Sequence, residues 1–497
     1  MTYMQSKKLF NKGWSNLKKV LGSKWFTVAI IALFVVQAGW IALSFRYPMI
    51  YDEGFHVDAT RLFSQQLTPW LSSQPERLDT YGVLSNGGAT LFHYLTSFLL
   101  RAVNVFTQNS AIEVITLRMA GVFMAAVGLY IYTKLFEFVG IPRHHANLAV
   151  LVFILLPIVP FVAATVNYDN MLFPLTGLFL YLGVRIIKSS KVTPHLLLWI
   201  LTVGLLTSLV KFTFMPVFAV GILYIAWSQI HLIRVRGNEY GRIIELKKRP
   251  ILLSGTALLI STLLFLSVYG VNIYRYGSLQ PSCDQVLTEA RCSNSYLVTR
   301  RNNAINTVDT RSLVQMPEYF SLWATQMINW TNMTGTLQSG EGLITKDPLP
   351  ILYATVYFGS LVGLVLVGRS TGILVGKEYM FLYAVTVGLT FAVFLQNYGT
   401  YLEVRYPYAI QPRYLLTVIP VILVACIYSA NQLLANRVAI KIVVLFGLGL
   451  LLTQGGGLTT HILKSDESWY WDNNNVVNVN NKARDILKPF VKEREDN

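Results

Sequence analysis

The sequence predicts an all-α polytopic membrane protein. Of its 497 residues, 53% are hydrophobic and only 13% are charged, which is far from the balance of a soluble protein. Apolar runs of about 18 or more residues recur along the chain, and each is long enough to cross a bilayer as a helix. Most of the 41 Lys and Arg residues lie in short segments between these runs. We therefore read the net charge of +16 as a sign of topology and of contact with membrane lipids, not of nucleic-acid binding.

The distribution of basic residues predicts which side of the membrane each segment faces. Residues 1–24 are rich in lysine and are expected in the cytoplasm, so the first apolar run, 25–45, leads to the extracytoplasmic side and is retained as a signal anchor. Residues 46–117 then form a long external loop, in which 88–106 is moderately apolar. If 88–106 crossed the membrane, the later basic loops would all lie outside, against the positive-inside rule. We predict that it is an amphipathic helix on the membrane surface.

This topology predicts about eleven spans and a simple division of the chain. A transmembrane module over 25–272, which includes the external loop 46–117, follows the basic amino terminus. A second large external loop covers 273–349, further transmembrane helices cover 350–454, and a polar external tail covers 455–497. After the first span, the predicted spans are 118–138, 147–165, 168–187, 195–211, 212–233, 251–272, 350–368, 378–396, 414–430 and 438–454.

The three cysteines leave the redox state of the second external loop open. Cys283 and Cys292 share that loop and would form a disulfide in an oxidising compartment, while two ordinary free thiols are the alternative. Cys426 lies in an apolar run, where we expect it to pack.

Two adjacent carboxylates and an imidazole follow the first predicted span. Acidic groups beside hydrocarbon are costly unless they are paired or used. Asp52, Glu53 and His56 are therefore candidate site residues at the membrane boundary. The alternative is a solvated loop whose acids face water.

Other polar residues are predicted at the same membrane face. Asn167 and Asp169 follow a proline-rich helix end, which suits a cavity lining but also a capped helix start. Lys211 interrupts a long apolar stretch at the outer end of a span. It would either reach the interface with its ammonium group or neutralise a phosphate.

A second cluster of polar residues lies between 397 and 414. Arg405 and Arg413 carry planar guanidinium groups that match phosphate oxygens bidentately, and a salt bridge to Glu403 is the plainer alternative. Together the carboxylates and cations suit a reaction in which a base deprotonates a nucleophile while cations stabilise a departing phosphate. A lipid-linked phosphosugar would explain why such chemistry lies at the membrane boundary.

At these residues the chain resembles the GT-C superfamily of polytopic glycosyltransferases, which use polyprenyl-phosphate or dolichyl-phosphate sugars. The likeness is to the branch that contains protein O-mannosyltransferases and lipid A aminoarabinose transferases, and it extends over most of 25–430. It implies a GT-C-like bundle with interfacial helices in the first external loop. The motifs that carry the resemblance are Asp52-Glu53-Gly54-Phe55-His56, Leu117-Arg118-Met119, Asn167-Tyr168-Asp169, Lys211-Phe212-Thr213 and Gln411-Pro412-Arg413-Tyr414.

The resemblance implies a role for each matching residue. Asp52 would be the general base, and Glu53 would orient the acceptor or support Asp52. No cofactor would be required, although a divalent cation at Asp52 and Asp169 stays an alternative. The implied contacts to the donor phosphate are Arg118, Lys211 and Arg413, and the implied acceptor or cavity residues are His56, Asn167, Asp169, Arg405 and Tyr414.

The predicted function is transfer of a sugar from a polyprenyl-phosphate donor to a cell-envelope glycan, lipid or protein, on the extracytoplasmic face of a bacterial cytoplasmic membrane. The sugar and the acceptor are left unassigned. One alternative is a glycolipid transporter or flippase, although transporters usually pair broken helices around a site near the bilayer midplane. The other is a polymerase or ligase that uses a diphosphate-linked oligosaccharide.

Overall fold

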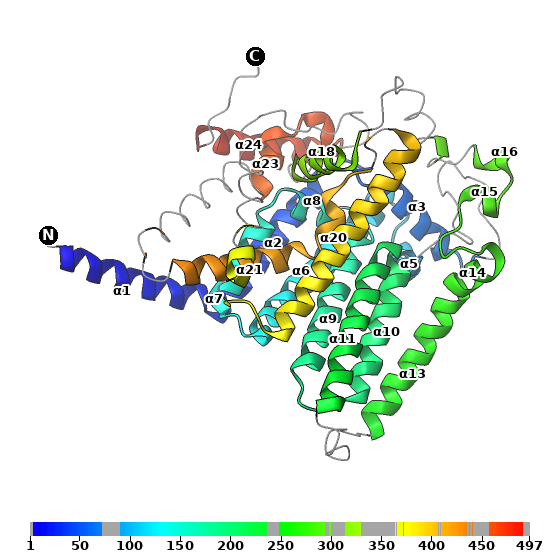
Figure 1. Ribbon diagram of the computed structural model, residues 1–497. Helices are drawn as coiled ribbons and strands as arrows, with labels where there is room; N and C mark the ends of the chain where they lie inside the picture. Colours follow the sequence, from blue (N-terminus) through cyan, green and yellow to red (C-terminus); the bar gives the residue numbers. More distant parts are fainter. Residues whose placement is uncertain are drawn as a thin grey trace.

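The fold is a helical bundle, shown in Figure 1 as a computed structural model. Within the residues that the structure describes, the chain is helical and contains no β-strand. The described residues are 3–71, 90–235, 248–293, 314–329, 365–370, 372–405 and 409–434, the segment 457–490, and the isolated positions 298, 299, 363, 407, 437 and 440.

The first part of the chain supplies most of the bundle. Its helices are α1 (Tyr3–Leu21), α2 (Lys24–Ser44), α3 (Glu53–Ser64), α5 (Leu91–Asn104), α6 (Ser110–Val139), α7 (Arg143–Ile154), α8 (Ile158–Ala164), α9 (Asp169–Lys188), α10 (Pro194–Val210), the 3-10 turn η1 (Phe212–Phe214) and α11 (Met215–Val235). The later helices are α13 (Lys248–Phe265), α14 (Val271–Tyr276), α15 (Cys283–Val286), α16 (Glu289–Cys292), α18 (Met316–Asn329), α20 (Lys377–Val404), the 3-10 turn η6 (Pro412–Leu415), α21 (Ile419–Leu433), α23 (Gly457–Lys464) and α24 (Asn474–Leu487).

Most predicted membrane spans correspond to apolar helices. Six described helical segments are long and apolar enough to cross a membrane, and the pair α7 and α8 makes a seventh if it is one bent span. The shorter apolar helices α10 and α21 match two further predictions. The chain is therefore a polytopic membrane protein. The predicted spans 350–368 and 438–454 lie largely outside the described residues.

Proline and capping residues change several predicted boundaries. The span predicted over 147–165 bends by 71° between α7 and α8, where Pro157 and Pro160 remove backbone donors and disfavour a straight helix. Helix α6 begins at Ser110 and not at 118, because the Asn109 side chain caps its first turn by accepting from the Ala111 N–H. Helix α20 continues to Val404, past the predicted end at 396.

The segment predicted as a surface helix is too short to cross the membrane. Helix α5 has 14 residues and is therefore about 21 Å long, whereas the hydrocarbon core of a bilayer is roughly 30 Å thick. It packs against α3, burying Phe92 and Ser97, while Leu95 and Phe98 stay exposed. This amphipathic arrangement agrees with the predicted helix along the membrane surface.

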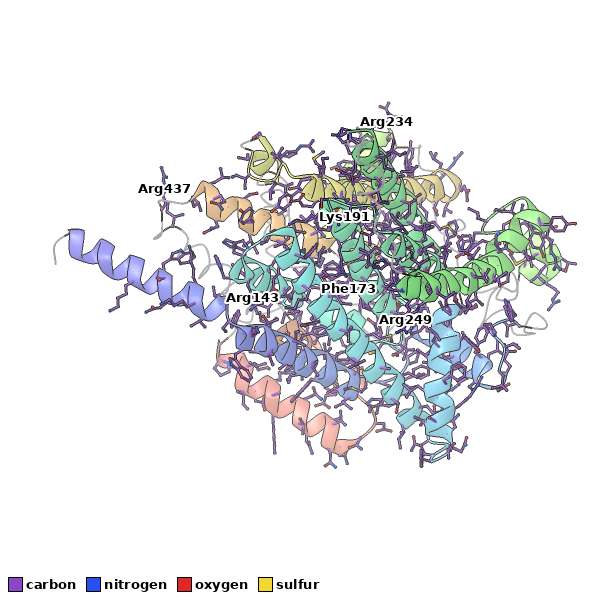
Figure 2. The ribbon with its side chains drawn as sticks, turned by 90° about the horizontal axis from the view of Figure 1, so that it is seen from below. Arg143, Phe173, Lys191, Arg234, Arg249 and Arg437 are labelled. Atoms are coloured by element: carbon purple, nitrogen blue, oxygen red, sulfur yellow. A yellow bond between two sulfur atoms is a disulfide. The ribbon has the colours of Figure 1, made fainter. Side chains whose placement is uncertain are left out.

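The helices bring the ends of several distant segments to one end of the bundle, which we call the site face. Helices α2, α8 and α10 end there, and α6 and α9 begin there. In Figure 1 the short helices α3, α8, α18, α23 and α24 lie at this upper end. The opposite end carries basic residues at helix termini and connections, of which Figure 2 labels Arg143, Lys191, Arg234, Arg249 and Arg437.

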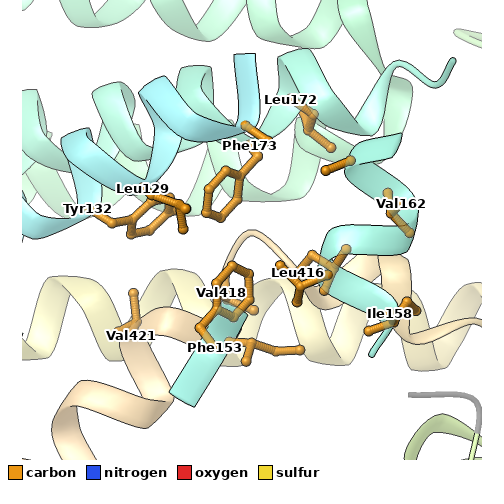
Figure 3. Packing of buried hydrophobic residues seen from close by; sticks show 14 of the residues in the cluster. Leu129, Tyr132, Phe153, Ile158, Val162, Leu172, Phe173, Leu416, Val418 and Val421 are labelled. Atoms are coloured by element: carbon orange, nitrogen blue, oxygen red, sulfur yellow. The ribbon is translucent and has the colours of Figure 1, made fainter. Parts of the chain in front are cut away.

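Close packing of aromatic rings holds α6, α7 and α9 together. The Phe173 ring of α9 stacks on Tyr132 of α6, with centroids 4.7 Å apart, and on Phe153 of α7 at 5.5 Å (Figure 3). Gly128 permits this approach, since a Cβ there would lie 2.3 Å from a Phe173 ring carbon. Val418, which precedes α21, packs in the same cluster. Because the cluster joins α9 to the segment after η6, it sets the relative positions of the residues at the start of α9 and in η6.

Candidate active site

The turn between α2 and α3 places Asp52 at the centre of a polar cluster. Tyr51 and Asp52 have φ angles of 70° and 64°, a left-handed conformation that side-chain-bearing residues seldom adopt and that is held only by strong surroundings. Two donors reach the Tyr51 carbonyl oxygen: Arg413 Nη1 at 3.0 Å and Asn167 Nδ2 at 2.9 Å. These two hydrogen bonds hold the carbonyl group of the turn.

Asp52 is the most accessible of the three predicted carboxylates. Its side chain is 32% exposed, whereas that of Glu53 is 0% and that of Asp169 is 4% exposed. Arg413 Nη2 donates to Asp52 Oδ2 at 2.9 Å, and this contact orients the carboxylate. Asp52 is thus the acid of this group that a second molecule could reach.

Two buried cations, Lys211 and Arg413, lie beside the Asp169 carboxylate, and Arg413 also contacts Asp52. Lys211 Nζ donates to Asp169 Oδ1 at 2.5 Å, and Arg413 Nε lies 3.9 Å from Asp169 Oδ2. The Lys211 ammonium also lies over the rings of Tyr168 and Tyr414, 4.4 and 4.6 Å from their centroids. The structure therefore brings together Asp52, Asp169, Lys211 and Arg413, which the sequence separates by more than 350 residues.

The surroundings of Lys211 weaken its hold on its proton. Burial lowers the pKa of Lys211 from 10.5 to about 8; the Asp169 carboxylate offsets part of this effect, and Arg413 lowers the pKa further. Lys211 is therefore a cation at neutral pH and becomes neutral as the pH rises above about 8.

Glu53 and Arg118 form a fully buried ion pair. Arg118 Nε and Nη2 each lie 2.8 Å from one Glu53 carboxylate oxygen, in a bidentate pair. The other Arg118 donors reach backbone oxygens: Nη1 donates to those of Ala42 and Phe45, and Nη2 also lies 3.5 Å from that of Arg46. All five donor hydrogens of the guanidinium have acceptors within the chain, which favours a structural role over the predicted contact with a donor phosphate.

Glu53 in turn binds backbone on both sides of the site. Its Oε2 accepts from the Met49 N–H at 2.7 Å, and its Oε1 accepts from the Val166 N–H at 3.1 Å. Glu53 thus links the turn before α3 to the segment before α9. Since its side chain is completely buried, this geometry favours support of Asp52 over direct contact with an acceptor.

A histidine pair forms a further wall of the cluster. His56 Nδ1 lies 2.9 Å from His93 Nε2, and the His56 ring meets Tyr168 edge to face at 4.5 Å. Burial lowers the pKa of both histidines, that of His93 to about 3, so both are neutral at neutral pH. The prediction included His56 but missed His93. The spacing of His93, Thr96 and Ser97 on one face of an apolar helix is the signal that could have found it.

The remaining predicted residues differ in position. Asn167 is buried and, besides its bond to Tyr51, accepts from the Asp169 N–H at 2.9 Å. Tyr414 lies beside Lys211, as above. Arg405 is exposed at the end of α20, and the contacts found among the described residues do not join it to the cluster.

The carboxylates do not form an evident metal site. Among the described residues there is no group of three or more His, Cys, Asp or Glu side chains placed to hold a metal ion. Asp52 and Asp169 are each paired with a cationic side chain, which does not favour a divalent cation between them. We therefore derive no step through a metal.

Comparison with proteins of known structure gives a likeness in fold at low sequence identity. Two of the matches are crystal structures of ArnT from Cupriavidus metallidurans. The structure bound to undecaprenyl phosphate matches with a TM-score of 0.46 and 12% identity, over 89% of this chain and 66% of that chain. The apo structure matches with a TM-score of 0.44 and 12% identity, over 91% and 67%. This chain thus spans about two thirds of the ArnT chain. No protein-family profile and no curated protein matches the sequence.

Proposed function

We propose that this chain is a membrane glycosyltransferase that moves a sugar from a polyprenyl-phosphate carrier to a cell-envelope acceptor on the extracytoplasmic face. The observation that carries the proposal is the accessible Asp52 beside the buried cations Lys211 and Arg413, where several helices end. The sequence resemblance to GT-C glycosyltransferases supports the same assignment.

The roles follow from exposure and charge. Asp52 accepts the proton of the acceptor hydroxyl or amine as that atom attacks the anomeric carbon. The bond from the anomeric carbon to the phosphate oxygen breaks in the same step, and the electron pair leaves with the lipid phosphate. Lys211 and Arg413 stabilise the charge on that leaving group. An in-line displacement of this kind inverts the anomeric centre.

Two features support an extracytoplasmic site. Cys283 and Cys292 form a disulfide in the segment after α14, which continues from the site face, and disulfides persist in oxidising compartments. The basic residues labelled in Figure 2 lie at the other ends of the helices, where the positive-inside rule expects the cytoplasm.

An apolar cavity suits the lipid tail of the donor. It has a volume of about 520 Å³ and is lined mainly by α18, α20 and α21, with the side chains of Trp323, Val387 and Phe394 among its walls. A hydrogen-bonded link joins it to the cluster: Trp323 Nε1 donates to Asn397 Oδ1, and Asn397 Nδ2 donates to the Ala409 carbonyl, four residues before Arg413. We assign an isoprenoid chain to this cavity, because its lining is apolar and its wall residues Val387 and Phe391 are exposed.

Filling the cavity is expected to weaken use of long-chain donors. Val387 lies on its wall, and Val387→Trp should raise KM about tenfold, equivalent to about 1.4 kcal/mol, for a donor with a full-length polyprenyl tail. A donor with two isoprene units should be affected much less, since its short tail has little apolar surface to lose from the cavity. Val36→Trp, on an exposed position of α2, is the matched control. Equal effects of Val387→Trp on both donors would remove this assignment.

Donor use is expected to fall as the pH rises above about 8. The ratio kcat/KM follows the protonation of the free enzyme, so it should decrease about tenfold per pH unit once Lys211 loses its charge. Lys211→Arg should shift this decrease to higher pH, because a guanidinium stays charged. Deprotonation of Lys211 does not lower the stability of the folded protein, so unfolding would not explain this decrease in kcat/KM. Its pKa is lowered on folding, so the unfolded chain binds more protons between about pH 8 and 10.5 and stability rises with pH there. The same pH profile in Lys211→Arg would contradict this role.

The function is tested with purified protein in lipid and a panel of polyprenyl-monophosphate sugars. Release of free polyprenyl phosphate from one donor would support the proposal and identify the sugar. Turnover confined to diphosphate-linked oligosaccharides would favour a polymerase or ligase. Movement of a glycolipid across proteoliposomes without a covalent product would favour a transporter.

A further inference from the structure

The carboxy-terminal segment 457–490, which we call the tail segment, packs back onto the site face (Figure 1). Its backbone is hydrogen-bonded to residues that precede the Tyr51–Asp52 turn, which carries the proposed base. The Arg46 N–H donates to the Trp469 carbonyl at 2.7 Å, and the Trp471 N–H donates to the Ser44 carbonyl at 3.1 Å. These contacts attach the tail segment to the end of α2, a few residues before Asp52.

Aromatic side chains of the tail segment surround Phe45. The Phe45 ring meets His461 at 6.0 Å, Tyr470 at 6.0 Å and Trp469 at 6.3 Å between centroids. Phe161 of α8 lies on the same ring at 5.9 Å. All five side chains are buried, and the tail segment supplies three of these four ring contacts of Phe45, the residue that follows α2.

The tail segment also reaches the buried ion pair behind Asp52. The Arg118 guanidinium lies 5.5 Å from the centroid of the Trp471 ring, a geometry in which a cation is attracted to the ring face. Arg118 holds Glu53, and Glu53 binds the N–H groups of Met49 and Val166. Contacts therefore run without a break from Trp471 to the backbone of Met49, which precedes the Tyr51–Asp52 turn, and to that of Val166, which precedes α9.

A second attachment holds the tail segment through α24. Asn480 is buried, accepts from Trp40 Nε1 at 2.9 Å and donates to Ser44 Oγ at 3.1 Å. Both partners belong to α2. Neighbouring Asn478 of α24 is exposed and offers a comparison on the same helix.

We propose that the tail segment is a positioning element of the active site, which holds the Tyr51–Asp52 turn in its left-handed conformation through Trp471, Arg118 and Glu53. The turn has an unfavourable backbone conformation and an accessible carboxylate, so its geometry depends on what is packed behind it. Lys211 and Arg413 belong to other elements, and Lys211 is held by Asp169 rather than by the turn. Loss of the Trp471 contact should therefore impair the base more than the binding of the donor. The role in catalysis rests on the proposed function.

The kinetic test compares Trp471→Ala with two other variants. We expect Trp471→Ala to lower kcat about tenfold and to change KM for the donor less than about twofold, because a misplaced base affects the transition state more than ground-state binding. Trp471→Phe keeps a ring face for Arg118 and should restore most of kcat. Trp25→Ala, at an exposed tryptophan of α2, should match the wild type. A larger effect on KM than on kcat would overturn the positioning role.

A second readout does not depend on the enzyme activity. Hydrogen exchange of peptides covering 46–56 should become faster in Trp471→Ala and in Asn480→Ala, while peptides from α11 and Asn478→Ala protein keep wild-type rates. If Trp471→Ala does not fold, Asn480→Ala carries both tests. Unchanged exchange at 46–56 in the folded variants would overturn the proposal. An inactive wild type would instead refute the proposed function and leave the exchange result to decide whether the tail segment holds the turn.

Discussion

Asp52→Asn is expected to lower donor turnover by about 10²- to 10⁴-fold, the usual contribution of a general base. The amide oxygen can still accept from Arg413, so the turn and the cation keep their places, but the side chain can no longer take a proton from the acceptor. KM for the donor should change little, because Lys211 and Arg413 remain. The measurement is release of polyprenyl phosphate at saturating donor and acceptor.

Asp58→Asn is the matched control for this experiment. Asp58 lies on α3, is 31% exposed and pairs with Arg61 at 3.3 Å, so it resembles Asp52 in exposure and pairing. It has no contact with Lys211 or Arg413 among the described residues, and its substitution should leave turnover close to the wild-type value. Full activity of folded Asp52→Asn protein would show that Asp52 is not the base.

Glu53→Gln is expected to destabilise the protein by about 3–5 kcal/mol, the usual result of removing one partner from a buried ion pair. The substitution leaves the Arg118 charge buried against a neutral amide and weakens the bonds that Glu53 accepts from Met49 and Val166. The free energy of unfolding can be measured by denaturant titration in lipid–detergent micelles.

Two comparisons make this result specific. Glu137→Gln breaks a partly exposed pair with Arg143 on the opposite end of α6 and should lose only about 0–1 kcal/mol. Adding Arg118→Met to Glu53→Gln removes the unpaired charge, so the double variant should be more stable than additivity predicts. Equal losses in Glu53→Gln and Glu137→Gln would contradict the structural role assigned to the Glu53–Arg118 pair.

The general architecture and the convergence of the polar residues at one end of the bundle could be predicted from the sequence. The apolar runs have the length of a membrane helix, and the basic residues between them predicted an orientation in which α5 does not span, in agreement with its length of 14 residues. Asp52, Lys211 and Arg413 each stand at the end of a predicted span, and one topology places all three at one face. Pro157 and Pro160 indicated a broken helix end, but the bend of 71° that divides the predicted span 147–165 was not predicted, because a hydropathy window does not register a backbone break.

The roles of the site residues depended on contacts that local patterns do not contain. Asp52 and Glu53 are adjacent and chemically alike, yet one is accessible and the other is sealed against Arg118, 65 residues away. His93 and Trp471 entered the site in the same way, through pairing with His56 and Arg118. The sequence by itself determined the membrane class and the face that carries the polar residues, because hydropathy and charge act segment by segment. Only the tertiary structure decided which carboxylate is exposed and which cations join it in one cluster, because burial and pairing arise when distant segments pack together.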